Sequence, residues 1–341
     1  MRRAPPATYA EAGVDIGAGE RAVERIRGLV ASTAGPEVLG GIGGFSGAFA
    51  FDADRYSEPI LLASTDGVGT KALVAMSAGR YGTIGMDLVA MCVDDLVCAG
   101  AKPLFMLDYV ATGKLEPERI EDLVSGVAAG CRQAGCALLG GEMAEHPGSM
   151  EPGEFDLAGF AVGAVERGEM LGPEKVEAGD VLVGLPSPGL RSNGYSLARH
   201  VLLERSGLSL DGPAWEGADH SLADVLLEPS VIYAPAIVAA LTVGGVHSAA
   251  HVTGGGIVGN LPRALPAGWG FVLDRSSWEV PRIFREVQRL GQVEDAEMER
   301  VFNLGLGMVL VVGGDAVGEV VATIKAAGQD ARVVGRVAAP S

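Results

Sequence analysis

Short apolar runs alternate along the chain with longer segments that carry hydrophobic residues at helical spacing. Runs rich in Val, Ile and Leu and bounded by Gly, Pro or polar residues predict strands. They lie at 59–64, 104–110, 137–140, 157–165, 181–185, 245–252, 270–273, 308–312 and 332–337. Helical spacing predicts helices at 84–98, 117–133, 194–206 and 280–291. This alternation is typical of an α/β or α+β fold, with strands such as 59–64 apolar enough to be buried on both faces.

Residues 166–180 separate two halves of similar size. The segment is rich in Gly, Glu and Pro and poor in apolar periodicity, which is the composition of a connection. We therefore expect two domains, residues 1–167 and 168–341, in agreement with roughly 100–200 residues per domain. The chain has no visible repeat with a period of 20–50 residues, which argues against a solenoid or a propeller.

The composition is that of a globular protein with an acidic surface. Hydrophobic residues make up 48% of the chain and charged residues 20%, and 43 Asp and Glu against 26 Lys and Arg give a formal charge of −17. This excess of negative charge repels a phosphodiester backbone and an anionic membrane. We expect small-molecule partners, with no nucleic-acid and no membrane binding.

The cysteines and the first residues of the chain indicate in which cellular compartment the protein is found. Cys92, Cys98, Cys131 and Cys136 form no Cys-x-x-Cys pair, so neither a zinc knuckle nor a redox dithiol is indicated. Residues 4–13 contain no apolar core of an export signal, and no run reaches the ~18 apolar residues of a membrane span. We expect a cytoplasmic protein with thiols that remain reduced.

Glycine is concentrated, with Asp, Asn, Ser, Thr or His, in six loops at predicted strand ends. The loops are 40–47, 65–71, 140–148, 187–194, 251–260 and 303–307. Glycine lets backbone N–H groups converge on an anion without obstruction by a Cβ. Any one loop is as readily a tight turn, but six together favour phosphate binding.

Two of these loops also match the dinucleotide-binding pattern G-x-G-x-x-[GA], which leaves a nicotinamide-dependent oxidoreductase as an alternative. In the match at 67–72, the acidic residue twenty positions further on, Asp87, falls inside a predicted helix. The match at 254–259 is followed by Pro262 and Pro266, which interrupt the long crossover helix of such a unit. Both matches are therefore weak.

Carboxylates gather near the first predicted strand and on the first predicted helix. Asp66 follows the strand, and Asp87, Asp94 and Asp95 lie on the helix. Asp87 and Asp94 are seven residues apart, close to two helical turns, so they share a face. Acids on an apolar helix are costly to bury unless a cation meets them. Two interpretations stay open: a solvated stripe, or ligands of a Mg²⁺ ion that carries nucleotide phosphates.

A series of motifs gives the chain a family resemblance that runs almost end to end. The pattern D-x4-G-A-x-P occupies 95–103. The other motifs are YAEAGVDI at 9–16, GGFSGAF at 43–49, STDGVGTK at 64–71, TIGMDLVAMCVDD at 83–95, DYVATGK at 108–114, GGEMAE at 140–145, SNGYS at 192–196, HVTGGG at 251–256 and FNLGLGM at 302–308. With these motifs the sequence resembles the aminoimidazole ribonucleotide synthetase superfamily, and within it the phosphoribosylformylglycinamidine cyclo-ligase family.

The resemblance implies an activity and an architecture. The expected reaction is the ATP-dependent closure of formylglycinamidine ribonucleotide to aminoimidazole ribonucleotide, through O-phosphorylation of the formamide and attack by the amine nitrogen. The expected fold has two α/β domains, with the N-terminal sheets of two chains pairing into a shared β-barrel in a homodimer. Mg²⁺ is the implied cofactor, and the need for a monovalent cation stays open.

The resemblance also implies site residues. Those expected to hold Mg²⁺ are Asp66, Asp87 and Asp95. Those expected to bind ATP are Gly43, Gly44, Asp66, Gly67, Gly69, Lys71 and Asp95. Those expected to bind the substrate are Arg191, Ser192, Asn193, Thr253, Gly254, Gly255 and Gly256. Those expected to be catalytic are His251, Asn193 and Glu142, with His251 as the proton acceptor.

Three of these assignments have competing interpretations. Lys71 is also compatible with a surface lysine, and His251 with a structural role. Arg191 stands where the family carries His, and Asp94 where it carries Asn, so any role of that His is not transferred. An Arg at this position can instead bind a ribose phosphate with two hydrogen bonds. A regulatory module that only binds nucleotide is a third possible function, disfavoured by the acids that the motif loops retain.

Overall fold

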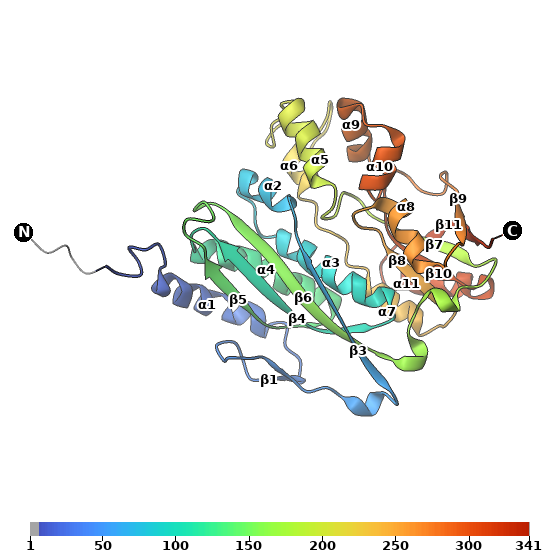
Figure 1. The fold of residues 1–341 in the computed structure, drawn as a ribbon, viewed down its shortest axis with the longest axis horizontal. Coiled ribbons are helices and arrows are strands. Elements are labelled where there is room, and N and C mark those ends of the chain that lie inside the picture. The colour runs from blue at the N-terminus through green and yellow to red at the C-terminus, as the bar shows by residue number, and fades with distance from the viewer. Residues whose placement is uncertain (1–6, 341) are drawn as a thin grey trace, which may run out of the picture.

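The computed structural model describes residues 7–340, which are organised around two β-sheets (Figure 1). The first sheet has the order β3-β6-β4-β5 and the second has the order β8-β10-β7-β11-β9. The strands of the first are β3 (Pro59–Gly67), β4 (Lys102–Thr112), β5 (Ala137–Glu145) and β6 (Phe155–Glu166). Those of the second are β7 (Val181–Pro186), β8 (Val246–His251), β9 (Gly270–Leu273), β10 (Leu306–Val312) and β11 (Arg332–Ala338). Pairing within the two sheets is antiparallel except between β4 and β5.

Eleven α-helices in the described residues surround the sheets, and a hairpin of β1 (Val38–Leu39) and β2 (Ala48–Phe49) precedes the first sheet. In the first half the helices are α1 (Ile16–Ala31), α2 (Lys71–Ala78), α3 (Ile84–Cys98) and α4 (Pro117–Ala134). In the second half they are α5 (Tyr195–Arg199), α6 (Leu222–Leu226), α7 (Ala234–Leu241), α8 (Gly256–Asn260), α9 (Arg282–Gly291), α10 (Asp295–Val301) and α11 (Val317–Ala326).

Helix α4 shows how local sequence sets these boundaries. Pro117 occupies the first turn, where its missing N–H costs no hydrogen bond. Gly135 ends the helix in the left-handed conformation at φ +71°, which a glycine adopts without a Cβ clash. Between them, residues such as Ile120, Leu123 and Val127 form the buried face. The helix matches its sequence prediction to within one residue.

The first sheet is covered on one face by α3 and α4, and its other face is open in the single chain. Burial along β3 alternates, and Leu61 is 61% exposed. Tyr109 and Phe160, at 40% and 41%, are also among the exposed apolar side chains of this sheet. The prediction that residues 59–64 are buried on both faces is therefore wrong for the chain alone, because β3 is an edge strand with one uncovered face.

Helix α3 joins the two halves, because it packs on β3 and β6 of the first sheet and also contacts β8 and α7 of the second half (Figure 1). One hydrophobic core runs through this contact, from Leu88 of α3 to Leu310 of β10. The connection after β6 is tied to both halves, since Leu171 N donates to Ala99 O and Gly172 N donates to His247 O. The contact between α3 of the first half and β8 and α7 of the second half, called the seam below, is thus a packed interface that can hold side chains in fixed positions.

Several predicted helices are shorter or more irregular in the structure. The segment predicted as one helix at 194–206 is α5 followed by a π-helix at His200–Arg205. The helix after the second glycine pattern, α8, has five residues, so the long helix of a dinucleotide-binding unit does not form there. The four cysteines are free thiols, and Cys98 is the half-buried one. In residues 7–340, no helix has the length and apolar character needed to cross a bilayer.

Candidate active site

Three glycine-containing loops from distant parts of the sequence meet at the seam between the two sheets. The loops are 66–70 at the end of β3, 191–194 just before α5, and 251–256 between the end of β8 and the start of α8. A Cβ added to Gly69 would lie 3.8 Å from Ser192 O, and one added to Gly254 would lie 3.6 Å from Asn193 Oδ1. The structure therefore brings together three of the motifs that the sequence singled out.

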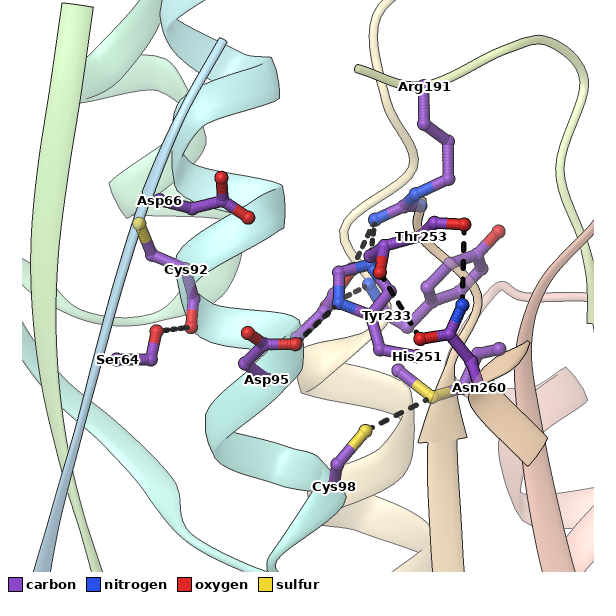
Figure 2. Close-up of polar contacts among 12 residues, drawn as sticks. Ser64, Asp66, Cys92, Asp95, Cys98, Arg191, Tyr233, His251, Thr253 and Asn260 are labelled. Atoms are coloured by element: carbon purple, nitrogen blue, oxygen red, sulfur yellow. Dashed lines mark hydrogen bonds and ion pairs between the residues drawn. The ribbon is translucent and has the colours of Figure 1, made fainter. Parts of the chain in front are cut away.

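Two carboxylates, Asp66 and Asp95, face the seam (Figure 2). Asp66 Oδ1 accepts a hydrogen bond of 2.7 Å from Gly67 N. Burial raises the pKa of Asp66, the Gly67 N–H lowers it, and the charge of Asp95 raises it again. The Asp95 side chain is 46% exposed and so remains accessible. Two carboxylates that repel each other at an accessible place are a setting in which a bound cation is favourable.

The donor set at this place fits a cation that also binds a nucleotide. Within residues 7–340, no group of three or more His, Cys, Asp or Glu side chains is arranged as a metal site. Mg²⁺ is usually held by one or two carboxylates, with substrate phosphates and waters completing its six oxygen ligands. Asp66 and Asp95 match that pattern.

His251 lies between the two halves of the chain and is 6% exposed. Its Nδ1 is 2.8 Å from Asp95 Oδ1, and its Nε2 is 3.0 Å from an Nη2 of Arg191 (Figure 2). A guanidinium only donates hydrogen bonds, so Nε2 accepts and the ring proton resides on Nδ1, facing Asp95. The sequence predicted His251 as a proton acceptor, but the nitrogen that would accept the proton already accepts a hydrogen bond.

Arg191 is buried in the seam rather than exposed on its loop. Its Nη2 donates to Asp94 Oδ2 at 2.8 Å and its Nη1 donates to Val231 O at 2.7 Å, while the guanidinium lies 4.8 Å from the ring centroid of Tyr233. Its backbone is left-handed, at φ +65°, which is uncommon for a residue with a Cβ. The expected contact between Arg191 and a ribose phosphate is not available to a guanidinium held in this way.

Lys71 and Asp87 form a second buried pair, in which neither side chain is exposed. Lys71 Nζ is 2.7 Å from Asp87 and also donates to Glu228 O, and Asp87 accepts from Ser230 N and Oγ. Burial lowers the pKa of Lys71, and the charge of Asp87 opposes this shift. Lys71 is therefore not a surface lysine, and the structure does not bring it or Asp87 into the open part of the site.

The two acids on the shared face of α3 are thus met by two basic side chains. Asp87 pairs with Lys71 of α2, and Asp94 pairs with Arg191 from the second half of the chain. The solvated-stripe interpretation is wrong for both, since both are fully buried. The requirement that a cation meet each buried acid holds, but the cations are side chains of the protein.

Asn260 holds the glycine loop at 253–256 and was not expected from the sequence. Its Nδ2 donates to Gly256 O at 2.8 Å, and its second N–H is shared between the carbonyl oxygens of Thr253 and Gly254, at 3.3 and 3.2 Å. Its Oδ1 accepts from Arg263 at 3.2 Å. The signal available in the sequence was an Asn four residues after the last glycine of the motif, which is the spacing of one helical turn.

A cavity of about 430 Å³ opens at this seam. It is lined by Ser64, Thr65, Asp95, His251, Asn260 and Arg263, among others. Arg263 is exposed and places a positive charge beside the carboxylate of Asp95. The lining therefore combines groups that suit a metal ion with one that suits an anion.

Gly43, Gly44 and Glu142 lie elsewhere in the single chain. They line a cavity of about 720 Å³ over the open face of the first sheet. Glu142 is exposed, and its Oε1 accepts from Met143 N at 2.8 Å. The residues expected to bind ATP therefore lie at two places in the structure, Gly43 and Gly44 at this open face and Asp66 and Asp95 at the seam.

The chain matches two family models that together cover most of its length. Residues 52–165 match the N-terminal domain of AIR synthase related proteins, and residues 177–341 match the C-terminal domain. A protein of Myxococcus xanthus (strain DK1622) named phosphoribosylformylglycinamidine cyclo-ligase is 52% identical over 332 residues, which cover 97% of this chain and 96% of that protein. One with the same name from Desulfitobacterium hafniense (strain DSM 10664 / DCB-2) is 48% identical, with coverage of 98% and 97%.

Solved structures share the fold at low sequence identity. The thiamine-monophosphate kinase of Stenotrophomonas maltophilia K279a has a TM-score of 0.70 and 19% identity, and the match covers 94% of each chain. The hydrogenase maturation protein HypE in complex with ATP has a TM-score of 0.63 and 16% identity, covering 94% of this chain and 86% of that one.

Proposed function

Since this chain belongs to the family of AIR synthase related proteins, we propose that it converts formylglycinamidine ribonucleotide and ATP into 5-aminoimidazole ribonucleotide, ADP and phosphate. The observation that carries the proposal is the 52% identity over nearly the whole chain to a protein named for this cyclo-ligase activity. The closeness of three motif loops to one another, with Asp66 and Asp95 facing the same seam, supports this seam as the location of the activity. The enzyme is a ligase of purine biosynthesis, and we assign it to the cytoplasm.

The chemistry requires activation of a poor leaving group. The formamide oxygen attacks the γ-phosphorus of ATP, ADP leaves, and the carbon then carries an O-phosphate. The amine nitrogen attacks this carbon, its proton is lost to a base, and inorganic phosphate leaves with the former formamide oxygen. The protein has to hold two anions close together, stabilise their charge and exclude water.

We assign Asp66 and Asp95 to the metal that accompanies ATP. A bound Mg²⁺ supplies positive charge to the transferring phosphoryl group. In this loop the N–H groups of Gly67 and Val68 donate to Asp66 Oδ1 and Leu157 O, and we assign the N–H of Gly69 to the phosphate oxygens. The ATP complex of a protein with the same fold supports a nucleotide site on this architecture. We leave Asp87 and Lys71 out of the site, because both are buried in their ion pair.

We assign the substrate to the second-half loops of the seam. Ser192 Oγ is buried and has no hydrogen-bond partner among the described residues, so it is available to a ligand. Asn193 Oδ1 lies beside Gly254, so both loops can reach the same substrate. The carbonyl and N–H groups of Thr253, Gly254, Gly255 and Gly256 complete this part, and Asn193 is the side chain that we place closest to the reacting amide.

We further propose that two chains pair through the open faces of their first sheets, in the shared barrel that the family resemblance implies. The exposed Leu61, Tyr109 and Phe160 supply an apolar surface for this contact. In such a dimer the loop with Gly43 and Gly44, and Glu142, would lie at the contact between the two sheets and add contacts to the nucleotide that is held through the metal of Asp66 and Asp95. Residues 1–167 would then form the ATP-binding and dimerisation domain, and residues 168–341 the substrate-binding domain.

The direct test is incubation of the purified protein with ATP, Mg²⁺ and formylglycinamidine ribonucleotide, with detection of aminoimidazole ribonucleotide and ADP. We expect one ADP for each ribonucleotide closed. A folded sample that forms no product, or that forms product without consuming ATP, would contradict the proposal. Size-exclusion chromatography with light scattering tests the dimer separately.

A further inference from the structure

A chain of hydrogen bonds links a buried ion pair to the proposed metal ligand. It runs from Asp94 Oδ2 to Arg191 at 2.8 Å, from Arg191 to His251 Nε2 at 3.0 Å, and from His251 Nδ1 to Asp95 Oδ1 at 2.8 Å. Asp94 and Asp95 are neighbours on α3. Arg191 and His251, which face Asp95 in Figure 2, come from the second half of the chain. The link therefore crosses the seam twice and returns to the next residue of the same helix.

Each hydrogen bond in this series has only one possible donor. Arg191 can only donate, so one N–H of its Nη2 points to Asp94 and the other to His251 Nε2. With Nε2 as acceptor, the ring proton of the neutral imidazole is on Nδ1, and it is donated to Asp95 Oδ1. No hydrogen bond from the described residues engages Asp95 Oδ2, so that oxygen is left for a ligand.

We propose that Arg191 is a positioning residue, which fixes the tautomer of His251 and thereby orients Asp95 for metal binding. The inference rests on the metal site of Asp66 and Asp95 proposed above. Outer hydrogen-bond partners of metal ligands set the orientation of those ligands, and their loss typically weakens metal affinity about 10- to 100-fold. Arg191 in turn is held from three sides, by Asp94, by Val231 O and by the ring of Tyr233.

The arrangement also explains why the seam contains a buried charge pair next to a functional carboxylate. A buried ion pair often contributes little net stability, because desolvation offsets the attraction. The Lys71–Asp87 pair on the same helix face has no contact with His251, whereas the Arg191–Asp94 pair does. The two pairs are therefore matched in burial and place but differ in the connection that we propose to matter.

The test variant is Asp94→Asn/Arg191→Asn. It removes both charges together, so no lone carboxylate is left buried, and Asn tolerates the left-handed backbone at position 191 better than other residues with a Cβ. The control is Lys71→Met/Asp87→Asn, which removes the matched pair. Two quantities are measured at one fixed pH: the His251 tautomer, from ¹⁵N–¹H NMR of histidine-labelled protein, and the affinity for Mg²⁺ in the presence of AMPPNP, from calorimetry.

In the wild-type protein we expect His251 with its proton on Nδ1, assigned among the 5 histidines by comparison with His251→Gln. The test variant should lose this single tautomer and bind Mg²⁺ about 10- to 100-fold more weakly. The control variant should keep the tautomer. A wild-type proton on Nε2, or a test variant with unchanged tautomer and Mg²⁺ affinity, would overturn the inference.

Asp95→Asn separates this inference from the metal site on which it rests. If Asp95→Asn leaves Mg²⁺ affinity unchanged, the proposed metal site fails and the inference fails with it. If Asp95→Asn weakens binding and the test variant does not, the metal site stands and the positioning role of Arg191 alone is refuted.

Discussion

Asp108 is the residue for which the structure gives the most quantitative prediction. It lies on β4 opposite Gly159 of β6 and Gly141 of β5, and its Oδ1 occupies the space that a Cβ at residue 141 would need. Its Oδ2 is inaccessible to solvent and has no hydrogen-bond partner among the described residues. A carboxyl group in this setting loses hydration, and a hydrogen bond from its own backbone N–H compensates only in part, so its charged form is disfavoured.

Burial raises the pKa of Asp108 from 3.8 to about 7. Between these two values the folded protein keeps a proton that the unfolded chain has released. The free energy of unfolding therefore falls as the pH rises through this window, and the loss is complete above the folded-state pKa. A difference of this size corresponds to about 4 kcal/mol, at ~1.36 kcal/mol for each pKa unit.

The perturbation is Asp108→Asn, which keeps the shape of the side chain and removes the titration. The variant should be about as stable as the wild type near pH 4 and up to about 4 kcal/mol more stable at pH 8. Urea unfolding at pH 5, 6, 7 and 8 measures this, with equal m-values as the check that the unfolding transition is comparable. Asp122→Asn on the exposed side of α4 is the matched control and should leave the pH dependence unchanged.

The reasoning would be refuted if the free energy of unfolding of the wild type did not fall more steeply between pH 5 and 8 than that of Asp108→Asn. It would mean that water or a relaxed backbone hydrates the carboxyl group.

Three further predictions concern the seam. Asp66→Asn should abolish ATP turnover while the thermal unfolding midpoint stays within a few degrees of the wild type, and unchanged turnover would exclude Asp66 from the metal site. Lys71→Met should lower the free energy of unfolding by about 3–5 kcal/mol, because it leaves the buried carboxylate of Asp87 without a partner. In urea unfolding, Lys71→Met/Asp87→Asn should recover most of this loss, and no recovery would contradict the role of the ion pair. Asn260→Ala should lower kcat/KM by about 100-fold, because the glycine loop that this side chain holds is displaced, while ATP affinity stays unchanged. Wild-type kinetics in this variant would show that the loop keeps its shape without the side chain.

Much of the fold could be predicted from the sequence, because the apolar pattern and the capping residues act locally. The helix at 84–98 and the strand at 270–273 have the predicted boundaries, and the other predicted strands overlap those of the structure. Helix α1 was missed although Asp15 caps it, since its buried residues include the small Ala18 and Ala22, which give a weak hydrophobic signal. The pairing of strands was not predictable, because it depends on contacts between segments far apart in the chain.

The candidate site could be predicted as a set of loops, but not as a set of contacts. The motifs singled out Asp66, Asp95 and His251, which the structure brings to one seam. The roles of Lys71 and Arg191 depended on whether each side chain is exposed, and a lone basic residue next to a glycine loop carries no information about its burial. Their partners, Asp87 and Asp94, lie 16 and 97 residues away in the sequence.

If this site activates the formamide oxygen by phosphorylation, that oxygen leaves with the inorganic phosphate, and an isotope label can follow it. Formylglycinamidine ribonucleotide labelled with ¹⁸O in its formyl group is incubated with the protein, ATP and Mg²⁺, and the released phosphate is analysed by mass spectrometry. We expect one ¹⁸O atom in the phosphate for each aminoimidazole ribonucleotide formed, and no product with Asp66→Asn. Ring closure with unlabelled phosphate would contradict it.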